Sequence, residues 1–555
     1  MIQWSPAPTP PAAADLVAGG LSPRLAPLLA RRGVGDLTAA DRFLRPAADH
    51  LHDPFLLAGM AAAVERLLAA RRDGERVAVV GDYDVDGVTA TALLVAVFAV
   101  CRLDARPILP HRLREGYGFQ PLHVERAREL GCRLIVTADC GTTATAAAEA
   151  AAAAGIDVIV TDHHLPSGGL PPGALVVNPR QEGSAYPYPD LAGVGLALKL
   201  ALAFAGRAGR PVELARLLRV ACLGTIADLV PLTGENRVIA ALGLTALADT
   251  PSAGLRSLFW RAGVRAPFTA ADVAFRLGPR LNAAGRLADA EAALELLLSR
   301  DGRRASELAD QLDRHNRARQ AEEVKVVEEA RRRFAERSPL PPIAVAWQAG
   351  WHQGVVGIAA GRIARELHRP VVLLSLEGDV ATGSGRSVPG IALHRFLERW
   401  QPRLARFGGH AQAVGLTVAG GDLPGLAREW EEAAREWPAE LLESCYEYEL
   451  ELAPGEVGGE LLAELSQLEP HGQGNPQPLL RIGPLTLVAP PREFGKGHLE
   501  LSARGDGGEP LSLVGWRWAE RRAELAGRFE ILGHLEEDRY RRRPVVRLID
   551  CRPAK

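Results

Sequence analysis

The sequence contains few cysteines, and none of them is spaced for metal binding or redox exchange. Its six cysteines are scattered through 555 residues, and no Cys-x-x-Cys pair occurs. This spacing argues against a zinc ribbon and against a thioredoxin-type site. Unpaired cysteines of this kind are typical of free thiols in a reducing cytosol.

Long hydrophobic runs are also missing. A helix needs about 20 apolar residues to cross a bilayer, and the apolar run from Leu93 to Val100 is much shorter. The N-terminus, Met1 to Pro6, lacks the basic and apolar regions of a signal peptide. We therefore expect a cytoplasmic protein without a membrane partner.

The chain has almost no net charge and very little lysine. The formal net charge is −2, so no overall basic field indicates a nucleic-acid partner. Only four of the 65 basic residues are lysines, and the others are arginines. Arginine forks bind phosphates with paired hydrogen bonds. GC-rich coding gives the same bias, so the arginine excess alone does not identify a partner.

The length and the composition predict several domains with large cores. A chain of 555 residues suggests three or four domains, and 47% of the residues are hydrophobic. We expect a helical lead-in at 1–48, a large α/β domain at 49–300, a connecting helix at 301–340, a second α/β domain at 341–440 and a C-terminal domain at 441–555.

Strands and helices alternate in the first α/β domain. Strands are predicted at 76–80, 133–137 and 156–161, with helices at 87–100 and 142–154. Such alternation predicts a parallel sheet covered on both faces. Ligands of such sheets gather at the carboxyl ends of the strands. Residues 195–300 are expected to be mostly helical.

The rest of the chain predicts a long helix, a second α/β unit and a barrel. The polar stretch 305–337 indicates a helix that stops at the prolines of 339–342. A second α/β unit begins at Ile343. Five short β-like runs with Gly and Pro turns then predict a small β-barrel, with an OB-fold as the leading choice; they lie at 485–488, 498–502, 511–516, 529–535 and 545–549.

Three aspartates, Asp82, Asp84 and Asp86, stand one residue apart directly after the first strand. Two unit charges ~5 Å apart cost roughly 3 kcal/mol at an effective dielectric of ~20, so the turn requires cations or protonation. Hard divalent cations prefer oxygen ligands. Aspartate also caps helices and stabilises turns. The turn alone therefore leaves metal binding and capping as equal alternatives.

Acidic and histidine residues also follow the next two strands. Asp139 follows the second strand, and Asp162, His163 and His164 follow the third. Because the carboxyl ends of parallel strands meet at one edge, we expect these side chains to converge. Carboxylates with one imidazole favour Mn²⁺ or Mg²⁺ over zinc. The candidate ligands of two such ions are Asp82, Asp84, Asp86, Asp139 and His163.

Two further residues have open roles. Asp228 lies in an otherwise apolar stretch, 224–231, and either caps a helix or binds metal; the sequence alone slightly favours capping. Two cations ~3.5–4 Å apart suit phosphoryl transfer, because they activate water and neutralise phosphate charge. His164 would then bind a phosphate oxygen or protonate the leaving oxygen. The alternative for His164 is a histidine that only orients the site.

Arginines beside glycines in several loops are candidate phosphate ligands. Glycine allows close approach of the backbone to an anion, and arginine and serine add donors. These candidates are Arg112, Arg280, Arg286, Ser384 and Arg386.

The ordered set of three acidic turns resembles the DHH phosphoesterase superfamily. Within it, the chain is similar to the RecJ family of single-strand-DNA-specific exonucleases from about residue 50 onward. The resemblance includes Gly-Thr-Ile-Ala-Asp-Leu-Val-Pro-Leu at 224–232 and further segments at 277–287, 316–320, 350–357 and 472–476. His111 and His471 depart from the family pattern, and neither belongs to a metal motif.

The resemblance implies a DHH domain and a DHH-associated domain joined by a long helix, followed by an OB-fold. It implies an exonuclease that degrades single-stranded DNA 5′→3′ to mononucleotides in recombination and repair, with two Mn²⁺ or Mg²⁺ ions. It also implies work with a helicase and a single-strand-binding protein. In the barrel, Trp516, Trp518, Arg517 and Arg541 to Arg543 are candidates to hold the strand. Barrel core is an equal alternative for the two tryptophans.

The same resemblance implies roles for individual residues. The metal ligands would include Asp228, which overrides the preference for capping, and His164 would contact the scissile phosphate, with Asp139 and Asp84 also catalytic. Ser384, Arg386 and His410 would lie near the 5′ phosphate. The side chains facing the strand would be those of Arg112, Arg280 and Arg286.

Two other functions compete with this interpretation. One is a DHH phosphodiesterase of short oligonucleotides or cyclic dinucleotides, against which the extra barrel argues. The other is a non-catalytic DNA-binding scaffold. Every expected acidic and histidine position is filled, which argues against a scaffold.

Overall fold

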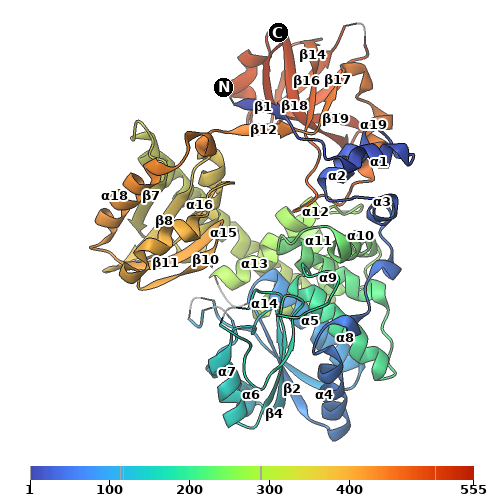
Figure 1. Cartoon of the computed structure of the whole chain (residues 1–555), viewed down its shortest axis with the longest axis vertical. Helices are drawn as coiled ribbons and strands as arrows, with labels where there is room; N and C mark the ends of the chain where they lie inside the picture. The colour runs from blue at the N-terminus through green and yellow to red at the C-terminus, as the bar shows by residue number, and fades with distance from the viewer. Residues whose placement is uncertain are drawn as a thin grey trace.

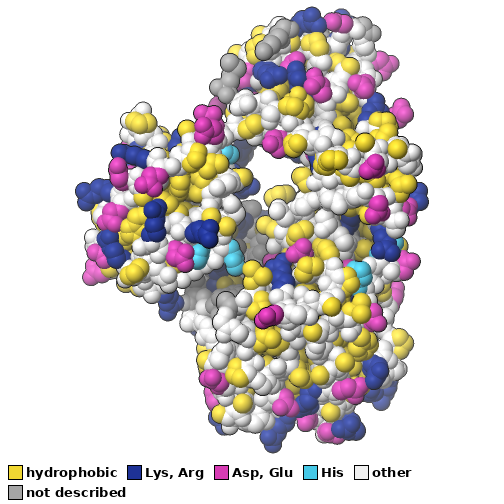
Figure 2. All heavy atoms as spheres, in the orientation of Figure 1, with side chains coloured by type: hydrophobic (Ala, Val, Ile, Leu, Met, Phe, Trp, Pro, Cys, Tyr) yellow, Lys and Arg dark blue, Asp and Glu magenta, His cyan; other side chains and the backbone are white. Residues whose placement is uncertain are grey.

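Three lobes surround a central opening in the computed structural model of the chain (Figures 1 and 2). The structure describes residues 2–554 except 113, 117, 167, 288, 289 and 507, and it leaves the side chains of 284, 286 and 287 undescribed. The chain runs through the first lobe, along a long helix into the second, and then into a barrel lobe. Both termini lie in the barrel lobe (Figure 1).

The first lobe is built on a five-stranded parallel sheet of order β3-β2-β4-β5-β6. The predicted strands are β2 (Arg76–Gly81), β4 (Cys132–Ala138) and β5 (Asp157–Thr161). The sequence analysis missed β3 (Asp104–Ile108) and β6 (Leu175–Val177), which are an outer strand with exposed residues and a strand of three residues. Val77 and Val79 pack into one core and Ala78 and Val80 into another, which explains the continuous apolar run.

Helices cover both faces of this sheet and extend the lobe. The helices around the sheet are α4 (Met60–Asp73), α5 (Val85–Val100), α6 (Pro121–Glu129), α7 (Thr145–Ala153) and α8 (Gly193–Arg207). The helical extension consists of α9 (Leu214–Ala227), α10 (Gly234–Leu247), α11 (Ala253–Ala262), α12 (Ala270–Asp272), a π-helical turn (Val273–Leu277), α13 (Gly278–Leu287) and α14 (Glu291–Leu298).

The connecting helix α15 (Gly302–Ala335) leads to a mixed sheet of order β10-β11-β9-β8-β7. Its strands are β7 (Ala344–Ala349), β8 (Val371–Glu377), β9 (Val380–Arg386), β10 (Arg406–His410) and β11 (Ala413–Ala419). Helices α16 (Gln353–Leu367), α17 (Leu393–Leu397) and α18 (Leu423–Ala433) accompany them. Among the described residues, no helix combines the length and the apolar character of a membrane span.

The C-terminal lobe is a closed barrel, because β14 pairs with both β18 and β16. Its strands are β14 (Leu480–Leu487), β16 (His498–Arg504), β17 (Leu511–Gly515), β18 (Arg528–Asp538) and β19 (Arg543–Pro553), with β13 (Leu450–Leu452) and β15 (Arg492–Phe494) at the edges. Helix α19 (Gly459–Ser466) lies between β13 and β14 in the chain. All five predicted runs fall on these strands. The predicted fold class, two α/β domains joined by a long helix plus a barrel, is confirmed.

The N-terminal segment belongs to the barrel lobe. Strand β1 (Gln3–Pro6) pairs in parallel with β12 (Cys445–Tyr448). Helices α1 (Ala12–Ala18), α2 (Leu25–Arg31) and α3 (Leu37–Leu44) share one hydrophobic core with the barrel strands. The stretch expected as a lead-in therefore covers apolar surface of the last domain (Figure 1).

Candidate metal centre

The aspartate turn is compressed between β2 and α5. Asp84 caps α5, because its Oδ1 accepts the N–H of Gly87 at 3.0 Å. A Cβ on Gly87 would lie 2.5 Å from the backbone nitrogen of Asp82, so only glycine permits this approach. The N–H of Val85 donates to Oδ1 of Asn282 from α13 at 3.2 Å.

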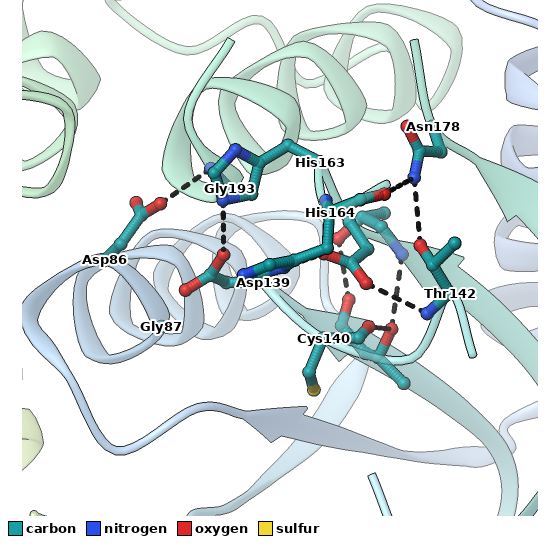
Figure 3. Close-up of polar contacts among 12 residues, drawn as sticks. Asp86, Gly87, Asp139, Cys140, Thr142, His163, His164, Asn178 and Gly193 are labelled. Carbon is teal, nitrogen blue, oxygen red and sulfur yellow. Dashed lines mark hydrogen bonds and ion pairs between the residues drawn. The ribbon is translucent and has the colours of Figure 1, made fainter. Parts of the chain in front are cut away.

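Asp86 joins this turn to the start of α8. Its Oδ2 accepts the N–H of Gly193 at 2.7 Å (Figure 3). Its Oδ1 accepts the N–H of Val194 at 2.8 Å. These are donors that α8 cannot satisfy internally, and the helix dipole favours a carboxylate there. Capping thus holds for Asp84 and Asp86, and each carboxylate oxygen keeps a further lone pair.

Asp139 occupies a backbone conformation that few residues adopt. It follows β4 with φ of 65°, in the left-handed region that aspartate tolerates better than most side chains. Its carboxylate packs against Gly193, where a Cβ would lie 2.5 Å from Oδ1 of Asp139. The turn directs Oδ1 of Asp139 to Nε2 of His163 at 3.2 Å (Figure 3).

The capping role slightly favoured for Asp228 from the sequence alone is wrong. Asp228 ends α9 at the C-terminal cap, where the helix dipole disfavours a carboxylate. The next helix, α10, has Thr233 at its N-cap position. The Asp228 carboxylate instead faces the turn after β5, with Oδ2 3.6 Å from Nε2 of His163.

The six side chains expected to bind metal divide into two groups of three. In each group, one ligand atom from every residue lies within 4.8 Å of the others; the groups are Asp82, Asp84 and Asp139, and Asp86, His163 and Asp228. Oδ1 of Asp82 is buried without a hydrogen bond from any described residue. His163 and Asp139 connect the two groups.

The charges of this cluster oppose one another. Burial, followed by the charge of Asp84, raises the pKa of Asp82 well above its usual value, and burial and neighbouring carboxylates do the same for Asp139. The same causes raise the pKa of Asp86 to about 7 and that of Asp228 to about 9. Burial, together with the charge of His164, lowers the pKa of His163 to about 3, so its imidazole is neutral and suited to ligation. Carboxylates with one neutral imidazole fit Mn²⁺ or Mg²⁺.

Sequence reasoning assigned no role to Asp162, which orients His164. Its Oδ1 lies 2.7 Å from Nδ1 of His164 and 3.1 Å from the His164 N–H, and its Oδ2 accepts the N–H of Thr142 at 2.9 Å. Asn178 in turn donates to the carbonyl of His164 and to Thr142, each at 2.9 Å (Figure 3). Burial acts to lower the pKa of His164, but the hydrogen bond and the charge of Asp162 raise it overall. The only signal for Asp162 was its place two residues before His164.

The predicted phosphate ligands come from both the first and the second lobe. Arg112 of the first lobe stacks on Tyr83, with Cζ 4.9 Å from the ring centroid. In the second lobe, Arg386 and Ser384 lie on β9 against the start of α16, where a Cβ on Gly357 would meet both side chains at 3.1 Å. Burial, then the charge of Arg112, lowers the pKa of Arg386, so the two cations lie close enough to interact across the lobes.

His410 lies at the edge of the same sheet. It pairs with Ala413 of β11, and Ala413 pairs with Arg386 on the other side, so His410 and Arg386 occupy one row across the strands. His410 is exposed, and the row continues the surface that carries Ser384 and Arg386.

The two arginines of α13 differ in what can be said of them. Arg280 is held by Asp313 of α15, with Nε 3.0 Å from Oδ1, and by the carbonyl of Arg276 at 2.6 Å. These contacts join α13 to the connecting helix. The side chain of Arg286 lies outside the described residues.

The barrel tryptophans take opposite positions. Trp518 is buried in the core of the barrel and packs under Arg521, whose Cζ lies 4.2 Å from the ring centroid. Trp516 is 53% exposed and stands beside His498 and Phe494, at centroid distances of 4.9 and 5.9 Å. The core alternative therefore holds for Trp518 alone.

Three family models match successive parts of the chain. They are the N-terminal domain of the DHH family at residues 76–225, the DHHA1 domain at 340–436 and the RecJ OB domain at 448–549. The single-stranded-DNA-specific exonuclease RecJ of Escherichia coli is 37% identical over 523 residues, which cover 90% of this chain and 89% of the relative. The chain belongs to the RecJ family.

Further members agree with this assignment. The RecJ exonuclease of Bacillus subtilis is 35% identical over 96% of this chain and 68% of its own length. A crystal structure of RecJ from Thermus thermophilus in complex with Mn²⁺ superimposes with a TM-score of 0.83 at 31% identity, over 100% of this chain and 80% of that one. A second structure from the same organism contains Mg²⁺. The family suspected from the motifs is confirmed.

Proposed function

We propose that this member of the RecJ family is an exonuclease that degrades single-stranded DNA from the 5′ end to 5′-mononucleotides. The observation that carries the proposal is the pair of ligand groups joined by Asp139 and His163 at the carboxyl edge of the first sheet. Two adjacent groups of oxygen ligands suit the hydrolysis of a phosphodiester, in which negative charge develops on the attacking and leaving oxygens. The curated relatives carry the same activity in their names.

The chain would hold two divalent ions, Mn²⁺ or Mg²⁺, at this edge. Asp82, Asp84 and Asp139 would form one site, and Asp86, His163 and Asp228 the other. Bound there, the ions would supply positive charge for the phosphate. They would also lower the pKa of water, so that hydroxide is available to attack the phosphate. The buried and mutually repelling carboxylates support this, because a cation removes the cost of placing them together.

The side chains around the ligands would bind and orient the strand. His164, fixed by Asp162, would contact the scissile phosphate and hold a proton near the leaving oxygen. Ser384, Arg386 and His410 would bind the terminal phosphate from the second lobe, and Arg112 would approach it from the first. Arg280 would act by holding α13 to α15, because its guanidinium is already engaged.

The remaining inferences concern the surroundings of the enzyme. Single-stranded DNA is the substrate of the family, and we propose that a helicase and a single-strand-binding protein supply it. We propose a cytoplasmic location, where such DNA would be met. Co-purification and cell fractionation test these two points.

A time course of nuclease activity tests the function directly. Strands labelled at the 3′ end and phosphorylated at the 5′ end would be compared as single strands and as blunt duplexes, in Mn²⁺, Mg²⁺ or EDTA. We expect mononucleotides from the single strand with either metal, little product from the duplex and none in EDTA. Preference for dinucleotides over long strands would favour the phosphodiesterase, and tight binding without cleavage would favour the scaffold.

A further inference from the structure

Helix α10 begins with three consecutive polar residues that are almost completely buried. Glu235, Asn236 and Arg237 are 1%, 0% and 2% exposed. Burying such groups is costly unless each finds partners. Their hydrogen bonds run in three directions, to the interior of the first lobe, to the loops around the metal centre and to the barrel lobe.

Asn236 joins the two loops that end beside the candidate ligands. Its Nδ2 donates to the carbonyl of Asp190 at 2.5 Å and to that of Pro231 at 3.1 Å. Asp190 lies just before Gly193, whose N–H binds Asp86. Pro231 follows Asp228 by three residues. One amide therefore fixes the loop before α8 relative to the loop after α9.

Arg237 joins the same helix to the barrel lobe. Its guanidinium donates to the carbonyls of Leu468 at 2.9 Å, Gln467 at 3.2 Å and Glu469 at 2.7 Å, which follow α19. It also donates to the carbonyl of Phe43 at 2.6 Å and lies over that ring, 3.9 Å from its centroid. Burial lowers the pKa of Arg237 to about 10, so it stays charged at neutral pH.

The segment after these carbonyls rests on the loop that follows Asp228. The N–H of Leu232 donates to the carbonyl of Gln473 at 2.7 Å. A Cβ on Gly472 would lie 2.6 Å from Cδ1 of Leu232, so the backbone of Gly472 packs closely on the Leu232 side chain. Asn475 is fully buried and donates to the carbonyls of Leu468 and Pro470 at 2.7 and 2.9 Å. The Gly-Gln-Gly-Asn-Pro motif at 472–476 is therefore part of the joint between the lobes.

We propose that Arg237 is a positioning residue that fixes the barrel lobe against the metal centre, so that a strand held by the barrel enters the centre in one register. The contacts form a continuous path from Asp228 through Pro231 and Asn236 to Arg237 and the barrel. The inference rests on the proposed function, because it concerns how a long strand is presented. A strand too short to reach the barrel gains nothing from this joint.

A second contact between the same lobes lies at the surface. Arg539, in the turn between β18 and β19, donates to Oδ2 of Asp272 at 2.8 Å and to Thr269 at 3.0 Å, at the start of α12. Its side chain is 44% exposed. The Asp272 side chain is 5% exposed, but it keeps the hydrogen bonds from the N–H and the hydroxyl of Thr269 when Arg539 is removed. We therefore expect removal of Arg539 to loosen the lobes without unfolding the chain.

The test compares strand lengths in the Arg237→Met protein. A 5′-phosphorylated strand of 4 nucleotides and one of 30 would be digested in Mn²⁺ under steady-state conditions. We expect KM for the long strand to rise about tenfold, while kcat/KM for the short strand stays within about twofold of the wild type. Arg237→Lys, which keeps the charge but reaches fewer carbonyls, should restore part of the loss. Arg528→Ala, which removes a surface pair with Asp506 inside the barrel lobe, is the matched control.

The outcomes separate the proposal from a general role in folding. An equal loss on both strands, or no change on either, would overturn the positioning role. If Arg237→Met does not fold, Arg539→Ala decides, with an expected two- to threefold rise in KM for the long strand alone; no rise counts against the proposal. Anisotropy of the labelled long strand in EDTA measures binding without cleavage. It keeps failure of the joint distinct from failure of the nuclease assignment.

Discussion

Two clusters of buried polar side chains lie in the first lobe and differ in how their charges are balanced. Around Asp139, carboxylates face one another, and Oδ1 of Asp82 has no hydrogen bond from a described residue. Around Glu235, each charge has a partner. Lys199 contacts Oε1 of Glu235, and Tyr186 donates to Oε2 at 2.7 Å. In the first cluster the carboxylates outnumber the cationic groups, whereas in the second the buried negative charge has a buried positive partner.

The difference separates groups that serve binding from groups that serve folding. A fold does not gain stability from carboxylates placed together, so their presence indicates an external cation. A buried pair that satisfies itself holds elements in place, and it is costly to break from one side. Removing a charge should therefore have opposite effects on stability in the two clusters.

The largest effect is expected at Asp139. Asp139→Asn keeps the size of the side chain but removes the charge of a residue that belongs to one ligand group and contacts His163 of the other. We expect nuclease activity in Mn²⁺ to fall by about a thousandfold or more, which corresponds to ~4 kcal/mol of transition-state stabilisation. The measurement is initial rate on a labelled single strand. Full activity in this variant would refute the assignment of Asp139 to the metal centre.

Stability provides the control for that variant. In EDTA, the free energy of unfolding of Asp139→Asn should exceed that of the wild type by about 1–3 kcal/mol, because the repulsion between one carboxylate and its neighbours is relieved. The variant should therefore unfold at a higher denaturant concentration. A loss of stability in EDTA would mean that the carboxylates stabilise the fold without a bound cation. The contrast between the two clusters would then break down.

A change in stability with the opposite sign is expected at Lys199. Lys199→Met removes one partner of a pair whose side chains are both 1% exposed, and leaves the charge of Glu235 behind. We expect a loss of about 3–5 kcal/mol in the free energy of unfolding, with and without metal. Urea titrations measure it. In the double variant Lys199→Met/Glu235→Gln, the loss should be smaller than the sum of the single losses; simple additivity would contradict the pairing.

The last prediction concerns the pH dependence of the stability of the metal-free protein. Asp86 and Asp228 have pKa values raised to about 7 and about 9, against ~3.9 in an unfolded chain. Between these values the folded state binds more protons than the unfolded state, so stability falls as pH rises. Each extra proton held by the folded state changes stability by ~1.4 kcal/mol per pH unit, so stability in EDTA should fall by roughly 1–3 kcal/mol per unit between pH 6 and pH 8, and Mn²⁺ should abolish this slope. Equal slopes in EDTA and Mn²⁺ would show that no cation binds here.

Much of the fold could be predicted because the sequence patterns of its elements are local. The apolar run of β2, the polar helix α15 and the five barrel strands each carry their own pattern. The convergence of Asp82, Asp139 and His163 followed from one rule about the edges of parallel sheets. Strand β6, with three residues, was too short to carry a pattern.

The features that could not be predicted from the sequence depend on contacts between residues far apart in the chain. The sequence around Asp228 did not show that α9 ends at this residue, where the helix dipole disfavours a capping carboxylate. Asp86 was recognised as acidic, but its bonds to the start of α8 depend on how two helices meet. The buried triplet at 235–237 reads as an ordinary polar helix start, because its partners lie up to 232 positions away. No local pattern encodes such pairings.

The shared core of α1–α3 and the barrel affects how the protein is made. These helices are synthesised before the barrel strands that cover their apolar faces, which come more than 400 positions later in the chain. At roughly 5–20 residues per second, the helices wait on the order of half a minute to two minutes for their partners. During that interval Leu16, Leu28 and Leu29, almost fully buried in the finished protein, are exposed to water. Translation speed and chaperone supply therefore bear on the yield of this enzyme.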